Sequence, residues 1–361
     1  MKCPYCVNDI TPKLKQKDNR SVYECTTCRR EIHRDIVEGE KTPQTSIGLI
    51  GYTGHGKTVY ITSLFYVLKF FQSSWPGYHY LCLDNEANTM VYERVRHFEE
   101  NAELPPGTPI NFPHPHLISY SSLPHFGDVR LTYYDVGGQV YENPASISDQ
   151  GRFVAHADTI FFLLSITEFG PLWTSEIQKR LDIYVNAVKN SMRVDTKKNQ
   201  NLVVVLTKAD LLTKKLSEPL QKHVFSGDYT RYNKLKEAFS EMRMSSKQIR
   251  KWLMDEQAGG FINLAESSFR RVEYCMVSST GSDPVKGRLA SKLNPKDPKR
   301  MLDPLLWALQ FKLPSNKTRN LLRIAVFTIF VMFIFTIVIK GRLPAAAKEA
   351  LPQLFQKTGK Q

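Results

Sequence analysis

The eight residues that begin at Gly51 constrain this chain more than any other feature. They read Gly-Tyr-Thr-Gly-His-Gly-Lys-Thr, and in such a run the glycines allow backbone N–H groups to surround phosphate oxygens. Residues 45–50 before the run predict a buried strand, and the apolar residues after Lys57 predict a helix. This order brings unpaired N–H groups and the positive end of the helix dipole to an anion. The alternative is a glycine-rich turn without a ligand.

We therefore predict a nucleotide-binding loop. In it, Lys57 reaches the β- and γ-phosphates, and the Thr58 hydroxyl ligates Mg²⁺. The predicted nucleotide contacts in this loop are Gly51, Gly54, His55, Gly56, Lys57, Thr58 and Val59.

Three further runs follow predicted strands. Asp135-Val136-Gly137-Gly138-Gln139 follows residues 129–134, so Asp135 stands at the C-terminal end of a strand, where ligands of open α/β sheets bind. Thr207-Lys208-Ala209-Asp210 closes the apolar stretch 202–206, and a weaker pair, Ser278-Ser279, follows residues 272–277.

The four runs, in this order, resemble the guanine-nucleotide-binding core of the Ras-like and translation-factor-like GTPases. The resemblance implies that Asp135 holds Mg²⁺, usually through water, and that the N–H of Gly138 senses the γ-phosphate. It also implies that Gln139 orients the attacking water, so that Gln139 and Lys57 are the catalytic residues.

The resemblance also selects the base. It implies that Asp210 accepts two hydrogen bonds from guanine while the Lys208 stem packs along the ring. Adenine lacks that donor pair, and a buried carboxylate would be left unpaired, so GTP and GDP are predicted over ATP. The sequence departs from the family at Thr207, where asparagine is commoner, and at Ser279, where the family has alanine. The predicted base contacts are Thr207, Lys208, Asp210, Ser278 and Ser279.

One contact of this family has no clear counterpart. About forty residues separate the first predicted helix from the predicted hairpin of residues 116–123 and 129–135. We predict that Thr108, in a proline-rich segment, contacts the γ-phosphate and Mg²⁺, with Thr89 as the second candidate. The alternative is that Thr108 only occupies a rigid turn.

Four cysteines near the N-terminus form a C-x₂-C…C-x₂-C pattern with eighteen residues between the pairs. This spacing predicts a zinc ribbon over residues 1–42, in which four thiolates hold one tetrahedral Zn²⁺. Disulfides are the alternative, but they are rare in the reducing cytosol. We expect the ribbon to be separable from the nucleotide-binding region. Its partner can be nucleic acid or protein, and the sequence does not choose between them. The predicted ligands are Cys3, Cys6, Cys25 and Cys28.

The C-terminal region carries an uncharged apolar run, residues 324–339. It spans roughly 24 Å as a helix, and its N-terminal neighbours extend it toward the ~30 Å of a bilayer core. We predict a transmembrane helix over residues 321–340 and a short basic tail over 341–361; a buried core helix is the alternative. Residues 312–361 hold nine Lys and Arg and one Glu, a net charge of +8 that suits anionic lipid headgroups.

Together these features predict an α/β chain. A P-loop GTPase fold, with a mostly parallel sheet and helices on both faces, is expected over residues 45–312, with insertions at 72–115, 169–199 and 211–271. The architecture is similar to the predicted bacterial double-GTPase group of conflict and membrane systems.

The predicted function is a single-pass membrane protein with a cytoplasmic GTPase that signals to an unidentified protein effector. No arginine finger is identified, so a partner or a second protomer is expected to supply one. The alternatives are a nucleic-acid-binding factor with a GTPase clock, and a nucleotide-bound scaffold that does not hydrolyse.

Overall fold

The computed structural model describes residues 1–17, 20–39, 42–107, 115–168, 172–212, 216–225, 229–285, 287–289, 291–312, 328–329 and 331–332. The chain divides into two compact units, residues 1–313 and 314–361, and every helix and strand named below belongs to the first. Apart from the four residues at 328–329 and 331–332, the predicted membrane span and basic tail lie outside the described residues. Within the described part of the chain, no helix has the length and apolar character needed to cross a membrane.

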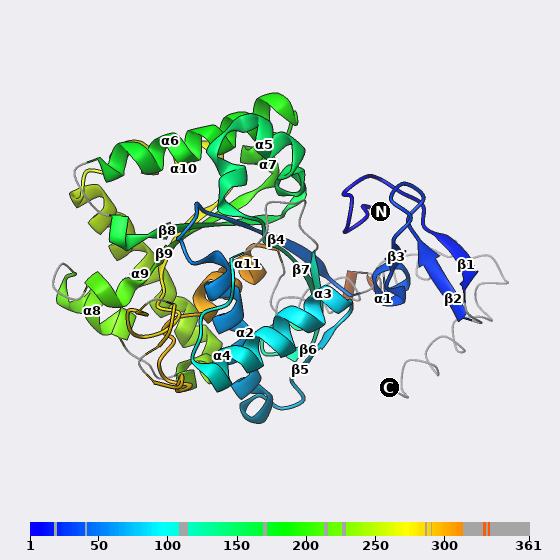
Figure 1. Ribbon diagram of the computed structural model, residues 1–361, viewed down its shortest axis with the longest axis horizontal. Coiled ribbons are helices and arrows are strands. Elements are labelled where there is room, and N and C mark those ends of the chain that lie inside the picture. The colour runs from blue at the N-terminus through cyan, green and yellow to red at the C-terminus, as the bar shows by residue number, and fades with distance from the viewer. Residues whose placement is uncertain are drawn as a thin grey trace. The chain divides into compact units, whose positions relative to one another are not determined.

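A seven-stranded sheet forms the centre of the first unit, in the order β10-β9-β8-β4-β7-β6-β5 (Figure 1). The five strands from β10 to β7 are parallel, whereas β6 and β5 pair antiparallel at one edge. Buried parallel strands read as near-continuous apolar runs, as residues 202–206 of the sequence do. The strands are β4 (Gln44–Ile50), β5 (His79–Cys82), β6 (His116–Leu123), β7 (Gly127–Tyr134), β8 (Thr159–Ser165), β9 (Asn201–Thr207) and β10 (Val272–Met276).

Helices cover both faces of this sheet, as Figure 1 shows. Successive side chains of a strand alternate between the faces, so Phe161 and Phe162 of β8 enter two different hydrophobic clusters. The first cluster contains α2 (Lys57–Ser74) and α11 (Leu302–Lys312), and the second contains α6 (Trp173–Asn186) and α10 (Gly259–Ser268). The predicted mostly parallel α/β fold with helices on both faces is therefore confirmed.

The three regions predicted as insertions are part of this body. Strand β5, in region 72–115, extends the sheet, and α6 and α10 supply the second face. Helix α9 (Leu235–Asp255) contributes its first half to one cluster and its second half to the other. The remaining helices are α1 (Arg34–Glu38), α3 (Asn85–Asn88), α4 (Val95–Asn101), α5 (Pro144–Asp149), α7 (Thr196–Asn199), α8 (Glu218–Phe225) and α9 (Leu235–Asp255).

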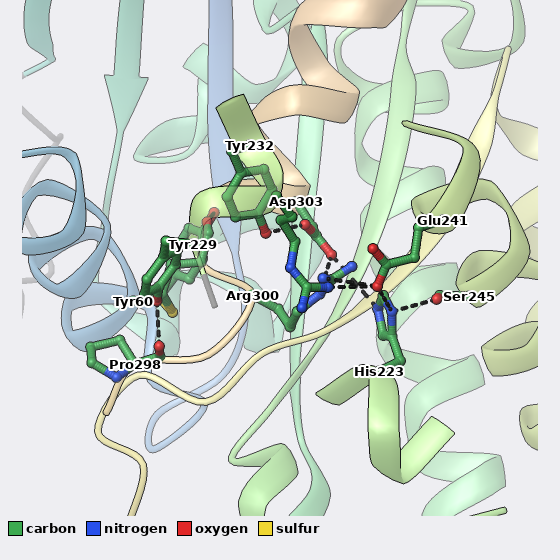
Figure 2. A network of polar contacts seen from close by, with 11 residues as sticks. Tyr60, His223, Tyr229, Tyr232, Glu241, Ser245, Pro298, Arg300 and Asp303 are labelled. Atoms are coloured by element: carbon green, nitrogen blue, oxygen red, sulfur yellow. Dashed lines mark hydrogen bonds and ion pairs between the residues drawn. The ribbon is translucent and has the colours of Figure 1, made fainter. Parts of the chain in front are cut away.

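A buried polar network ties α8 and α9 to the loop before α11 (Figure 2). Arg300 Nε donates to Asp303 Oδ2 at 2.9 Å, and the Tyr232 hydroxyl donates to Asp303 Oδ1 at 2.6 Å. Arg300 also reaches Glu241 at 3.3 Å, and His223 Nδ1 lies 2.6 Å from Ser245 Oγ. Paired in this way, the buried charges hold the loop before α11 in place. The Ser, His and Asp here are no hydrolase site, because all three are buried.

This network predicts acid sensitivity. Burial lowers the pKa of His223, and the hydrogen bond from His223 and the charges of Arg300 and Arg231 lower the pKa of Glu241 to about 2. In the unfolded chain, His223 and Glu241 take up protons at a higher pH than in the folded protein. The free energy of unfolding therefore decreases as the pH is lowered past about 6.5, and it decreases further as the pH is lowered from about 4.5 to about 2. Urea unfolding followed by tryptophan fluorescence across this pH range measures the decline.

The variant His223→Gln should reduce the decline that begins near pH 6.5. The surface substitution His79→Gln is the matched control and should leave it unchanged. An unfolding free energy that stays constant between pH 7 and pH 4.5 would contradict the prediction.

Candidate functional site

The predicted phosphate loop joins β4 to the first turn of α2. Gly54 and Gly56 have φ values of +84° and +78°, a backbone region that L side chains rarely adopt, so both positions require glycine. The Lys57 ammonium folds back over the loop and donates to the Gly51 carbonyl at 2.5 Å and the Tyr52 carbonyl at 3.4 Å. Burial lowers the Lys57 pKa, and the charge of Asp135 opposes that shift. The loop thus holds a cation among backbone N–H groups at a helix N-terminus.

The second run lies directly against this loop. Asp135 follows β7 and is 3% exposed, and its Oδ2 accepts a hydrogen bond from Thr58 Oγ1 at 3.1 Å. A Cβ on Gly138 would lie 2.2 Å from the Thr53 nitrogen, so a larger residue cannot occupy this position. Carboxylate and hydroxyl oxygens that meet in this way are ligands of the type that Mg²⁺ binds.

Two tyrosines that sequence reasoning missed connect the phosphate loop to the second run. The Tyr52 hydroxyl donates to the Tyr141 carbonyl at 2.8 Å, and the Tyr141 hydroxyl donates to the Leu49 carbonyl at 3.0 Å. Burial raises the pKa of Tyr52 to about 12, so its hydroxyl stays protonated as a donor. Gln139, between them in sequence, has an exposed side chain on the pocket wall. No local pattern signals these contacts, because about ninety residues separate the partners.

The predicted base-binding run approaches the same loop from β9. The Thr207 hydroxyl lies 3.0 Å from the His55 carbonyl oxygen and 3.3 Å from that of Leu164. Lys208 has a φ of +59°, which turns the chain sharply after the strand. Asp210 is half-buried and lines the pocket. Threonine at position 207 therefore ties the end of β9 to the glycine-rich loop.

Ser278 and Ser279 have different positions. Ser279 lines the pocket, and its carbonyl accepts a hydrogen bond from Ser63 of α2 at 2.9 Å. Ser278 is fully buried, its hydroxyl accepts from the Gly281 N–H at 3.0 Å, and it does not line the pocket. Ser278 thus shapes the loop, and only Ser279 of this predicted pair reaches the site.

The side chain of His55 also turns away from the pocket. It is fully buried, with Nδ1 2.8 Å from the Leu163 carbonyl oxygen and Nε2 2.8 Å from Glu168 Oε1. Arg180 donates to Glu168 Oε2 at 2.7 Å and stacks over the Tyr52 ring at 4.2 Å. Burial lowers the His55 pKa. His55 therefore supports the loop from beneath.

These runs surround a pocket of about 400 Å³. Two further segments, residues 104–107 and 280–284, complete its wall. The first segment pairs with residues just after the second, since Leu104 N donates to the Gly287 carbonyl at 2.9 Å and Arg288 bonds Glu103 at 2.6 Å. No local pattern of residues indicates this pairing. The described residues that line the pocket are Tyr52, Thr53, Gly54, Gly56, Lys57, Thr58, Val59, Leu104, Pro105, Gly107, Val136, Gly137, Gly138, Gln139, Thr207, Lys208, Asp210, Leu211, Ser279, Thr280, Ser282, Asp283 and Pro284.

Neither threonine predicted to contact the γ-phosphate is found at the pocket among the described residues. Thr108 lies outside the described residues, although Gly107 before it lines the pocket. Thr89, the second candidate, is exposed in the helical segment Thr89–Arg94 and does not line the pocket.

The four N-terminal cysteines come together beside a small sheet of β1 (Lys13–Lys17), β2 (Arg20–Glu24) and β3 (Glu31–Ile32). The four Sγ atoms lie within 4.8 Å of one another, and the pairs Cys3–Cys28 and Cys6–Cys25 are 3.8 Å apart. Four sulfurs at 2.3 Å from one zinc ion would be separated by about 3.8 Å, the edge of that tetrahedron. The donor set therefore fits a structural zinc ion, as the spacing predicted.

The ribbon contacts the α/β body beside Asp135. The Tyr134 hydroxyl donates to the carbonyl of Pro4, which lies between two of the cysteines, at 2.9 Å. Val7 is 5% exposed and belongs to the hydrophobic cluster that contains Tyr134 and Val136. The residues on both sides of Asp135 are thus packed with the cysteine-rich segment, which the sequence did not indicate.

No protein-family model and no curated protein matches this chain. Among solved structures, the chain is similar to a GTP-binding protein from the hyperthermophilic archaeon Sulfolobus solfataricus in complex with GDP, at 13% identity and a TM-score of 0.28 over 68% of this chain and 50% of that one. It is also similar to sup35 complexed with GDP, at 14% identity and a TM-score of 0.29 over 70% of this chain and 41% of that one. The chain spans about half the length of these structures or less.

Proposed function

We propose that this chain is a guanine-nucleotide-binding switch that hydrolyses GTP slowly and signals from a membrane to a protein partner. One observation carries the proposal. The phosphate loop, the run after β7 and the run after β9 meet around one pocket, in which Thr58 bonds Asp135.

The pocket suits a nucleoside triphosphate with its phosphates at α2 and its base at β9. Lys57 and the N–H groups of the glycine loop bind the phosphates. Thr58 and Asp135 would hold Mg²⁺, which offsets phosphate charge when bound. At the other end, Asp210 accepts hydrogen bonds from the N1–H and 2-amino group of guanine, and Lys208 packs along the ring. Thr108 remains our candidate for the γ-phosphate contact.

Hydrolysis would depend on few groups. The exposed Gln139 side chain positions water beside the γ-phosphate, and Lys57 offsets the charge that develops there. Among the described residues that line the pocket, none is an arginine. A protein partner or a second copy of the chain therefore supplies that charge in this proposal.

A pair of substitutions tests this function. Gln139→Leu should bind GTP with nearly wild-type affinity and hydrolyse it more slowly, because Gln139 acts mainly in the transition state. Thr58→Ala should lose most of its Mg²⁺-dependent affinity, since it loses the hydroxyl that meets Asp135. Calorimetric titration with GTP and single-turnover phosphate release separate the two effects. Tight GTP binding without turnover in the wild type, unchanged by Gln139→Leu, would show a nucleotide-bound scaffold instead.

The membrane part of the proposal rests on the apolar run 324–339 and the basic residues around it. We place the nucleotide-binding unit on the cytoplasmic side of a single span. Full-length protein should then resist 1 M salt and alkaline carbonate and yield only to detergent. Salt screens charges within about 3 Å at 1 M, so extraction of the intact protein by salt would contradict a spanning helix.

A further inference from the structure

A second cavity, of about 520 Å³, opens at the other end of α2. Its walls are the last turns of α2, the 3₁₀ turn Tyr229–Lys234, and the loop before α11. It is comparable in volume to the nucleotide pocket, about 400 Å³. The described residues that line it are Val67, Phe70, Phe71, Ser74, Tyr229, Thr230, Asn233, Pro295, Lys296 and Lys299.

The lining combines aromatic side chains with two lysines, and the Lys299 ammonium donates one hydrogen bond to the Lys296 carbonyl. Phe70 is 37% exposed, and its ring packs on one side against Tyr66 with the ring centroids 5.1 Å apart, so part of the ring remains accessible to a ligand. Lys296 and Lys299 lie on the same loop, and none of the described lining residues is acidic. The neutral polar groups are partly used, because Asn233 Oδ1 accepts from the Trp75 indole at 2.9 Å. A pocket of this kind favours a flat apolar body with one anionic group.

The walls are held in place by buried contacts. The Tyr229 hydroxyl donates to the Pro298 carbonyl, and Figure 2 shows both residues beside the network that anchors Arg300 to Asp303. The ring of Phe71 stacks on Trp75 with centroids 4.1 Å apart. The cavity is therefore formed before any ligand enters, which lowers the entropic cost of binding.

Two short paths connect this cavity to the nucleotide pocket. The backbone of Lys299 pairs with Ser278 through N–O distances of 2.7 and 3.1 Å, and the neighbouring Ser279 lines the nucleotide pocket. Ser63 of α2 donates to the Ser279 carbonyl at 2.9 Å. Helix α2 itself begins at Lys57 in the phosphate loop. A ligand that contacts Phe70 and Lys299 thus touches both elements that position Ser279.

We propose that this cavity is a regulatory site for a small amphipathic anion, an aromatic or acyl carboxylate, whose binding changes the affinity for guanine nucleotide. The regulatory half rests on the proposed function, whereas ligand binding does not. Coupling between two sites is reciprocal, so nucleotide must change the affinity for the anion by the same factor.

Naphthalene-2-carboxylate is the probe, and titration of purified full-length protein without nucleotide tests the site itself. We expect saturable binding, weaker binding of the neutral 2-naphthalenemethanol, and about ten-fold loss in Phe70→Asp or in Lys296→Glu with Lys299→Glu. The matched controls are Lys292→Glu, an exposed lysine of the same loop outside the lining, and Leu81→Asp, another exposed apolar residue. Both should bind the probe like the wild type.

Equal binding by Phe70→Asp, by the double lysine variant and by the wild type would overturn the site. If the probe does not bind, but attachment to anionic phospholipid vesicles requires Phe70, Lys296 and Lys299, the site for a small anion is overturned. These residues would then contact a lipid surface instead. Unaltered far-ultraviolet circular dichroism and an unaltered thermal unfolding midpoint show that the variants are folded. In the wild type, saturating probe should change GDP affinity about five-fold or more, and an unchanged affinity would overturn the regulatory role. If GDP does not bind at all, the proposed function fails while the probe titration still decides the site.

Discussion

The variant Asp210→Asn is expected to lose its preference for GTP and to bind xanthosine triphosphate instead. In the proposed function the Asp210 carboxylate accepts from two N–H donors of guanine, whereas an amide presents its own N–H group, which pairs with the carbonyl that xanthine carries. Two hydrogen bonds to a charged group are worth about 1.5–3 kcal/mol each, so GTP affinity should fall by roughly 100-fold or more. Competition between fluorescent GDP and unlabelled GTP, XTP and ATP measures the change.

A second aspartate provides the comparison. Asp283 also lines the pocket, on the loop after β10, but belongs to none of the four sequence runs. Asp283→Asn should keep the preference for GTP. If Asp283→Asn moves the preference to xanthine and Asp210→Asn does not, the base lies against the other loop. Equal affinity of the wild type for ATP and GTP would contradict guanine recognition altogether.

Removal of metal from the four-cysteine cluster is expected to weaken nucleotide binding as well as to unfold the ribbon. The ribbon has few apolar residues, so its fold depends on the metal. Without it, Tyr134 loses its acceptor on Pro4, and Val7 leaves the cluster that contains Val136. Both neighbours of Asp135 then lose these contacts, so only part of the protein keeps the geometry that binds nucleotide. If that part is one tenth of the molecules, the nucleotide affinity falls about ten-fold. A colorimetric chelator measures the release of zinc, and hydrogen exchange at the end of β7 measures the loss of structure beside Asp135. Calorimetry with GDP measures the loss of nucleotide affinity.

Variants distinguish an effect of the cysteine cluster on nucleotide affinity from a general loss of folded structure. Cys25→Ser with Cys28→Ser should lose one equivalent of zinc and reproduce the effect of chelation. Tyr134→Phe removes only the hydroxyl that meets Pro4, so it should retain zinc and lose a smaller part of the affinity. Cys82→Ala, a buried cysteine outside the cluster, is the control and should keep both. Wild-type nucleotide affinity in the metal-free protein would show that the ribbon is an independent domain, as its sequence alone suggests.

The sequence by itself determined the parts of this protein whose cause is local. Gly54 and Gly56 are fixed because a loop of that shape needs positive φ, and Asp135 and Asp210 are found because each follows an apolar strand. The order of apolar runs and turns was sufficient for the α/β class. The cysteine spacing was sufficient for the tetrahedral donor set, because two short C-x₂-C turns each bring a pair of thiols together.

Tertiary structure decided the contacts that join distant parts of the chain. Tyr52 bonds Tyr141, Leu104 bonds Gly287, and Tyr134 bonds Pro4, across separations of 89 to 183 residues. Ser278 occupies the predicted place in sequence, yet its side chain is used by the loop and only Ser279 reaches the pocket. No pattern of neighbouring residues encodes such pairs, because their free energy arises only when packing brings the partners together. For the same reason, only the folded chain revealed the second cavity and the contact between the ribbon and the two neighbours of Asp135.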